Sequence, residues 1–305
     1  MRTTLKSMIY AALALISISA GAQNDLIQSQ YIHNRFAVNP AFAGNREGVT
    51  IFGSFRKQWA GIENTPMSML LTSHAPLRHD NIVIGLTAYN QSIHETSNSG
   101  ALATIGYRAR ATEKTWLEFA LQPGVAMHSY NWNKVKVMDT DDKAFSKSES
   151  ATTPLLGFGM SWYGRSHFLG VSTTSLLVSN DFYDHDSKFA PDSANYIFTG
   201  GYMFDVTDRF QLQPSTLISF RKGNDTVIDG TLTAIYNDFI WVDAGYRTTD
   251  ELTFGAAVQV NPQLRIAYNF DLSIGDLNGV HYGSHEISIQ YDFVYRVKTV
   301  SPKFF

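Results

Sequence analysis

The sequence predicts an all-β protein, a transmembrane antiparallel up-and-down outer-membrane β-barrel of about 14 strands. Three observations lead to this fold class. Apolar and polar residues alternate in short segments between Gly48 and Tyr295, aromatic residues gather at the ends of these segments, and the connections between the segments are alternately long and short.

The alternation is clearest in the last segment, residues 284–293. Its odd positions hold His285 and then apolar or aromatic residues, and its even positions hold polar residues. Because side chains point alternately to the two faces of a strand, this segment would have one apolar and one polar face. Comparable segments are expected to begin near Gly48, Met67, Asn81, Gly100, Thr115, Leu155, His167, Ala194, Phe210, Thr226, Ile240, Glu251, Gln263 and Ser284.

Aromatic residues help to choose between two architectures that fit alternating strands. A soluble sandwich buries its apolar faces, whereas a membrane barrel turns them to lipid. Outer-membrane barrels carry aromatic girdles where lipid meets water, which favours the barrel. The expected girdle residues are Trp59, Tyr89, Tyr107, Trp116, Trp162, Tyr163, Tyr202, Phe204, Tyr236, Tyr246, Tyr291 and Phe293.

Connection lengths give an independent reason. The long connections all follow odd-numbered strands: Asn90–Ser99, Tyr130–Thr153, Ser175–Ser193 and Asp271–Gly283. Connections after even-numbered strands are mostly tight: Ala111–Lys114, Gly164–Ser166, Val206–Asp208, Asn237–Phe239 and Asn261–Pro262. With both termini in the periplasm, this is the outer-membrane rule of long extracellular loops and short periplasmic turns. A sandwich has no reason to sort its loops by parity.

The N-terminal residues predict export. Arg2 and Lys6 precede an apolar run, and small residues at 20–22 suit a signal peptidase, so residues 1–22 are a predicted signal peptide. The run is shorter than the ~20 residues that a spanning helix needs, which disfavours an N-terminal anchor. The chain has no cysteine, which excludes disulfides and argues against lipid attachment after cleavage.

We expect three further parts: residues 23–47 as a structured periplasmic or lumenal segment, residues 48–296 as the barrel, and residues 297–305 as a periplasmic tail. The segment 23–47 does not alternate. It contains an Asn-Pro pair that initiates turns, and Gly44, which can adopt positive φ. We expect it to plug or brace the inner mouth of the barrel.

An ordered set of motifs lies in this region: Gln30-Tyr31, an Asn-Pro-Ala-Phe-Ala-Gly box, Arg56-Lys57-Gln58-Trp59 and a nearby proline. This set resembles the PorP/SprF family. The residues that carry the resemblance are Asn39, Pro40, Ala41, Phe42, Ala43, Gly44, Arg56, Trp59 and Pro66.

The resemblance implies a non-enzymatic outer-membrane component of the type IX secretion system of Bacteroidota. Such a barrel would act as a scaffold or partner for secretion or surface attachment of cargo proteins, including adhesins in gliding motility. The implied partners are ring or translocon subunits, or a surface protein with a C-terminal sorting domain. No cofactor is implied.

Two loop clusters could carry chemistry. Asp139, Asp141 and Asp142 could ligate Ca²⁺ with Glu149 further on, although a solvated acidic loop explains them better. The Asp184-His185-Asp186 run could hold a metal or pair an acid with a base, but it lacks further ligands at a telling spacing. We assign no catalytic, cofactor-binding or metal residue.

The chain lacks the marks of an enzyme. No Gly-x-Ser-x-Gly elbow identifies a nucleophile, and no glycine-rich loop would hold phosphate. The adjacent pairs His94-Glu95 and His285-Glu286 would point to opposite strand faces. The net charge of −3 gives no footprint for nucleic acid.

The polar faces would enclose the lumen with charges of both signs in nearly equal number. A selective pore would carry one sign in excess, whereas balanced charges predict pairs that fill the interior. We therefore expect a largely occluded barrel. The residues expected inside are Arg56, Arg108, Arg110, Arg221, Arg247, Arg265, Glu118, Asp229, Asp243, Asp271, Glu286 and Asp292.

Other functions stay open at this point. The main alternative is a passive outer-membrane porin for small solutes. A barrel enzyme that acts on lipid and a soluble β-sandwich are further alternatives.

Overall fold

The computed structural model of the protein describes residues 29–46, 48–77, 81–131, 149–179 and 187–293. The predicted signal peptide, the C-terminal tail 297–305 and the clusters Asp139–Asp142 and Asp184–Asp186 lie outside these residues.

The described chain is almost entirely antiparallel sheet. The strands of the main sheet are β1 (Val49–Lys57), β2 (Met67–Pro76), β3 (Ile82–Ile93), β4 (Thr96–Thr112), β5 (Thr115–Tyr130), β6 (Glu149–Gly164), β7 (His167–Thr173), β10 (Asn195–Tyr202), β11 (Phe204–Thr207), β12 (Phe210–Arg221), β13 (Val227–Tyr236), β14 (Ile240–Arg247), β15 (Glu251–Gln259), β16 (Leu264–Ser273) and β17 (Ser284–Phe293).

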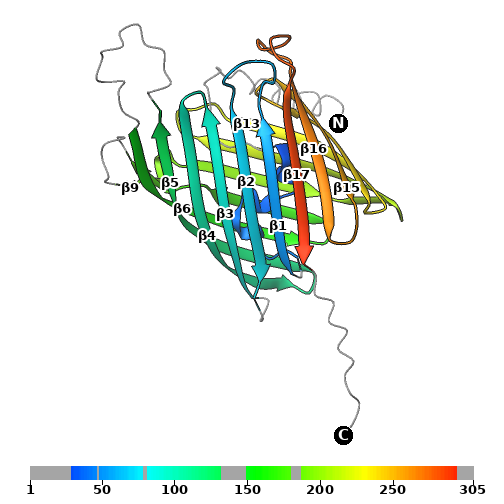
Figure 1. The fold of residues 1–305 in the computed structure, drawn as a ribbon. Helices are drawn as coiled ribbons and strands as arrows, with labels where there is room; N and C mark the ends of the chain where they lie inside the picture. The colour runs from blue at the N-terminus through cyan, green and yellow to red at the C-terminus, as the bar shows by residue number, and fades with distance from the viewer. Residues whose placement is uncertain (1–28, 47, 78–80, 132–148, 180–186, 294–305) are drawn as a thin grey trace, which may run out of the picture.

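These strands form a closed wall (Figure 1). Each strand pairs with its neighbours in the sequence, and β17 pairs with β1 from Val49↔Phe293 to Lys57↔His285. The strands β10 and β11 are two halves of one wall strand, because both pair with β12. The wall is therefore a closed barrel of 14 strands, and the predicted fold class is confirmed.

The pleat separates an apolar outer face from a polar inner face. In β17 the Ile289 side chain is 51 % exposed and that of its neighbour Gln290 is 4 % exposed. The same alternation runs through the other strands, and the exposed positions are mostly large apolar residues. The sidedness that the sequence predicts is therefore the sidedness of the wall.

The two ends of the barrel differ in their connections. Segments 58–66, 94–95, 131–148, 174–194, 222–226, 248–250 and 274–283 join strands at one end, which we call the long-loop mouth. Segments 77–81, 113–114, 165–166, 208–209, 237–239 and 260–263 join them at the other, the short-turn mouth. The connection 174–194 includes a hairpin of β8 (Leu177–Ser179) and β9 (Ser187–Phe189) and a turn of 3₁₀ helix, η6 (Pro191–Ser193).

One expected long connection is wrong. Asn90–Ser99 is mostly strand, because β3 and β4 extend to a two-residue turn at His94-Glu95, where His94 has φ 51°. Strand β6 likewise begins at Glu149, six residues before the expected Leu155. These extensions have polar residues on both faces, so alternation could not reveal them.

Three expected girdle residues point into the lumen instead. Tyr163 Oη donates a hydrogen bond to buried Glu118 Oε2 (3.1 Å), and the Trp116 ring lies 4.7 Å from the Arg108 guanidinium. The Tyr89 ring covers Gly100 on the inner face. A strand-end position predicts the depth of an aromatic residue in the membrane, but only its parity predicts the face.

The segment before β1 lies inside the barrel, drawn in dark blue in Figure 1. It consists of three 3₁₀ turns, η1 (Ser29–Ile32), η2 (Arg35–Ala37) and η3 (Pro40–Phe42). Its apolar side chains pack against inward-facing wall residues, for example Phe36 and Ala43 against Val83. The buried core of the molecule is therefore the boundary between this segment and the wall.

Across the described ranges, the structure contains no helix with the length and apolar character that a membrane span would require.

Spin labels on β17 test the sidedness of the wall. A label at Ile289 should be accessible to oxygen dissolved in lipid, because that side chain faces outward. A label at the adjacent Gln290 should be shielded from lipid, and the pair serves as its own control. Lipid contact at Gln290 with water contact at Ile289 would show that the wall is inside out.

Candidate functional site

The Asn-Pro-Ala box is bound to the wall at β6 and β7. Asn39 Nδ2 donates hydrogen bonds to the carbonyl oxygens of Met160 (3.1 Å) and Val171 (3.3 Å). Asn39 Oδ1 accepts from the Ala41 backbone N–H (2.9 Å), and so caps η3. Asn39 thus joins two wall strands to the start of a 3₁₀ turn, and its side chain uses both donor and acceptor groups.

Four small inward-facing residues make room for the box. A Cβ added at Gly159 would lie 2.2 Å from Asn39 Oδ1, and one added at Gly170 would lie 2.6 Å from Asn39 Nδ2. Each glycine pairs with a serine of the neighbouring strand, and Ser161 Oγ donates to the Ala41 carbonyl (2.5 Å) and Ser172 Oγ to the Val38 carbonyl (2.6 Å). We call Gly159, Ser161, Gly170 and Ser172 the small-residue seat.

Gly44 ends the box at a tight point between β2 and β4. Its φ is +63°, and an added Cβ would lie 2.6 Å from the Val83 side chain, so glycine is required there. Its N–H donates to His74 Nδ1 (3.0 Å), and its carbonyl accepts from Arg108 (2.8 Å).

Aromatic contacts hold the two phenylalanines of the segment. Phe42 contacts Phe168 edge-on at 6.0 Å, and Phe36 contacts the His74 ring at 4.9 Å. The Arg35 guanidinium lies 3.8 Å from the centroid of the Phe168 ring, a cation–π distance. Residues 35–44 therefore contact the wall through backbone, amide and aromatic groups at once.

The N-terminal part of the segment reaches the opposite wall. Tyr31 Oη donates to Asp229 Oδ1 (3.3 Å), and His33 Nε2 lies 3.1 Å from Asp243 Oδ2. Burial, and then the Asp229 charge, raise the pKa of Tyr31, so its phenol stays a donor. Asn34 donates to Thr72 on β2 (3.0 Å). We call residues 31–44 the plug, because they bridge the lumen from β2 and β6 to β13 and β14.

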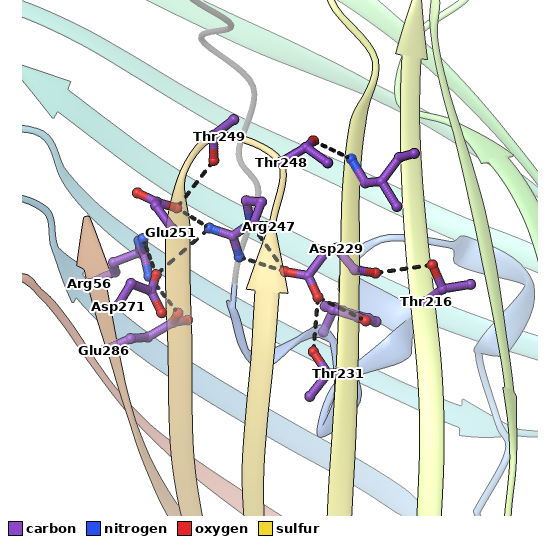
Figure 2. Close-up of polar contacts among 12 residues, drawn as sticks. Arg56, Thr216, Asp229, Thr231, Arg247, Thr248, Thr249, Glu251, Asp271 and Glu286 are labelled. Atoms are coloured by element: carbon purple, nitrogen blue, oxygen red, sulfur yellow. Dashed lines mark hydrogen bonds and ion pairs between the residues drawn. The ribbon is translucent and has the colours of Figure 1, made fainter. Parts of the chain in front are cut away.

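A network of ion pairs lies beside the plug toward the long-loop mouth (Figure 2). Arg247 contacts Glu251 (2.6 Å), Asp229 (3.0 Å) and Asp271 (3.7 Å). Arg56 contacts the same Asp271 (2.6 Å) and Glu286 (3.4 Å). We call these six residues the acidic cluster, because two guanidinium groups face four carboxyl groups. Each of six neighbouring wall strands contributes one residue to the acidic cluster, which therefore links β13, β14, β15, β16, β17 and β1.

The expected inward charges are mostly where the sequence predicts them. Arg56, Arg108, Arg247, Glu118, Asp229, Asp243, Asp271, Glu286 and Asp292 are buried. Arg221 and Arg265 are partly buried, and Arg110 is exposed at the end of β4, where its guanidinium lies 4.9 Å from the Trp116 ring. The balance expected along the lumen does not hold locally, since acidic groups dominate near the long-loop mouth.

Basic groups dominate at the short-turn mouth. Two adjoining cavities of about 340 and 390 Å³ lie there and share Arg35, Asn45, Arg165, Met203 and Gln213. The other basic residues that line them are Arg46, Arg265 and Lys114. Arg46 pairs with Asp292 at 3.0 Å, close to the start of β1.

Trp59 and Pro66 lie in the connection from β1 to β2 at the long-loop mouth. The Trp59 N–H donates to Ser284 Oγ (3.3 Å), and the Gln58 N–H donates to the Pro66 carbonyl (2.9 Å). The motif residues therefore occupy two places: the box is in the lumen, and Arg56, Trp59 and Pro66 are at or near one rim.

The adjacent pair His285-Glu286 is divided between the two faces of β17. Within the described ranges, no three His, Asp or Glu side chains are placed to hold a metal ion. His285 Nδ1 contacts Tyr268 Oη (2.6 Å) on the outer face, while Glu286 points inward to Arg56.

Sequence reasoning missed the small-residue seat and the separation of charge between the mouths. The seat had a signal: Gly159, Ser161, Gly170 and Ser172 are small residues at inward positions of two neighbouring strands. The charges could have been sorted by the strand end on which each lies.

Comparison with curated proteins gave no match. Among solved structures, the Ralstonia pickettii toluene transporter TbuX has a TM-score of 0.52 at 10% identity, covering 88% of this chain and 94% of that chain. The CymD monoaromatic hydrocarbon channel has a TM-score of 0.50 at 12% identity, covering 90% and 95%. At this identity the likeness shows the fold alone, that of an outer-membrane barrel.

The family comparison is more specific. The profile described as "Type IX secretion system membrane protein PorP/SprF" matches residues 20–291, which include the plug, both parts of the motif and nearly the whole wall. Together with the barrel fold, this match confirms the predicted outer-membrane location. The chain belongs to the PorP/SprF family of outer-membrane barrel components of the type IX secretion system.

Proposed function

We propose that this barrel is a non-enzymatic scaffold of the secretion system, closed to solutes, that holds partner proteins at its mouths for secretion or surface attachment of cargo. The filled lumen carries this proposal. Tyr31, Phe36 and Phe42 are 1, 2 and 1% exposed, and the plug contacts wall strands on opposite sides. A pathway for cargo or solutes through this lumen would have to remove the plug.

Ion pairs between neighbouring wall strands also support the proposal. The acidic cluster joins β13, β14, β15, β16, β17 and β1 near the long-loop mouth through buried ion pairs. A network of this kind makes that part of the wall rigid, which suits a surface that presents loops to a partner.

The mouths offer the surfaces for partners. The connections 131–148 and 174–194 would contact cargo or translocon outside the cell, because long loops on a rigid scaffold commonly carry function. Most plug side chains pack against the wall, so a periplasmic ring subunit would contact the short-turn mouth and, within residues 31–44, only side chains that line its cavities, such as Arg35.

A small-solute porin is the second candidate. The two cavities at the short-turn mouth favour it, because they extend into the lumen from that side. Swelling of liposomes that contain the pure protein in small sugars would support the porin over the scaffold.

Detergent extraction of native membranes, affinity capture of the tagged chain and mass spectrometry test the scaffold role. We expect ring or translocon subunits, or one large surface protein, at amounts comparable to the barrel. Capture of neither, in detergents that preserve the barrel, would contradict the proposal. An unrelated outer-membrane barrel with the same tag is the control.

Bilayer recordings should show that the plug closes the lumen. Wild-type protein should give no large steady conductance. G159V or G170V should open it, because each added side chain overlaps the site of Asn39. G230V is the matched control, since nothing lies within 4 Å of a Cβ added there on the outer face. A large steady conductance of wild type would contradict closure.

Removal of Arg247 should destabilise the barrel. R247Q leaves buried Asp229 and part-buried Glu251 without their cation, and breaking a buried ion pair costs about 3–5 kcal/mol. Denaturant unfolding in micelles measures the loss. K222Q is the control, because the exposed pair of Lys222 and Asp192 (3.6 Å) should contribute less than about 1 kcal/mol. Equal stability of the two variants would show that the acidic cluster does not hold the wall.

A further inference from the structure

The short-turn mouth has the composition of an anion site. Among the residues that line its two cavities, Arg35, Arg46, Arg165, Arg265 and Lys114 are basic, and Asp238 is the one acidic residue. Of these bases, Arg46 is already paired, with Asp292. Cavities of this size fall in the range of ligand sites, about 300–1,000 Å³.

Arg35 gives the strongest evidence for a bound anion. It lies on the plug, lines both cavities and stacks on Phe168, with its Nε buried and without a hydrogen-bond partner among the described residues. No carboxyl group in the described ranges forms an ion pair with it. Burial, and then Arg46, lower the pKa of Arg35 to about 10, so the group is still cationic at neutral pH. Burial of a cation without a carboxylate costs free energy unless a bound anion pairs with it.

Arg265 on the opposite wall shares the aromatic contact of Arg35. Its guanidinium lies 4.0 Å from the Trp241 ring centroid, and its Nε donates to Gln259 (3.0 Å). Two guanidinium groups, each stacked on an aromatic ring, therefore face one lumenal space. Stacked guanidinium groups keep their edges available for bidentate contact with carboxylates.

The rest of the lining suits a peptide. Side-chain amides of Asn45 and Gln213 offer donors and acceptors that match a peptide backbone. Gln211 and Gln290 add acceptor oxygens, since their amide nitrogens already donate to Asp205 and Asp292. Met203 and Trp241 offer apolar contact for side chains between the acidic ones. The cavities lie inside the wall, which excludes a membrane lipid as the ordinary ligand.

We propose that the short-turn mouth binds an acidic peptide segment of a periplasmic protein, with carboxylates at Arg35 and Arg265 and entry past Arg165 and Lys114. This deepens the proposed function and rests on it for the side of the membrane, because short turns of outer-membrane barrels are periplasmic.

Fluorescence anisotropy with the purified full-length barrel in neutral detergent tests the site. The probe is a short synthetic peptide of alternating aspartate and leucine with an uncharged fluorophore, and its control has asparagine for aspartate. We expect binding of the acidic peptide only. R35Q and R265Q should each weaken it at least about tenfold, the loss expected when a charged hydrogen bond is removed.

R265Q keeps the test valid if R35Q disturbs the plug, because Arg265 lies on the wall strand β16 and not on the plug. K222Q removes the same charge at the opposite mouth and should leave binding unchanged. Equal binding of the asparagine peptide, no binding of either peptide, or an equal loss in K222Q would overturn the proposal. Displacement by inorganic phosphate at the same concentration as the peptide would also overturn it, since the site would then accept any anion.

The outcome is independent of the scaffold role. The assay contains no secretion component, whereas the affinity capture and the bilayer recordings test the scaffold without the peptide. A barrel that captures partners but binds no acidic peptide would lose only this inference.

Discussion

Closure of the wall between β1 and β17 is the constraint on which the rest of the structure depends. In lipid, each unpaired backbone group costs several kcal/mol, so the first and last strands must pair. The register of that pairing brings Arg56 opposite Glu286 and Thr50 opposite Asp292. Both pairs face inward and are bonded, with Thr50 Oγ1 donating to Asp292 at 2.8 Å. A shift by one residue would turn these polar groups to lipid.

The same constraint explains how much of the fold could be predicted. A closed wall between lipid and lumen forces strict alternation, so Ile289 and Gln290 reveal their faces in the sequence alone. The alternation stops where the wall leaves the apolar zone. Residues Thr96 to Ser99 therefore have the polar composition of a loop, although β4 includes them. The parity of Tyr89, Trp116 and Tyr163 along their strands likewise predicts that they face the lumen, whereas their depth in the membrane does not predict a face.

The plug could not be predicted in the same way. Asn39 bonds to carbonyl groups 121 and 132 positions along the chain, and no local pattern encodes such contacts. The local pattern does show where such a contact is sterically possible. Gly159 and Gly170 have no side chain at the place where the Asn39 amide approaches the wall. The lumenal charges show the same limit. Strand parity predicts that Asp271 faces the lumen, but not its partner or its position along the barrel axis, and Arg35 lies in a 3₁₀ turn to which parity does not apply.

The plug and the wall also limit how this barrel could open. η2 and η3 contact each other, so release of Asn39 would also break the bonds from Ser161, Ser172 and Arg108 to the plug backbone. Each such bond contributes about 0.5–1.5 kcal/mol, and the buried aromatic contacts add to them. A partner that inverts even a 1:99 equilibrium must favour the open state by about 5.5 kcal/mol. A partner bound at the short-turn mouth would contact Arg35 on the plug itself, and its carboxylate would stabilise the plugged state. Binding at that mouth and closure of the lumen would therefore reinforce each other, which is the behaviour of a scaffold and not of a gate.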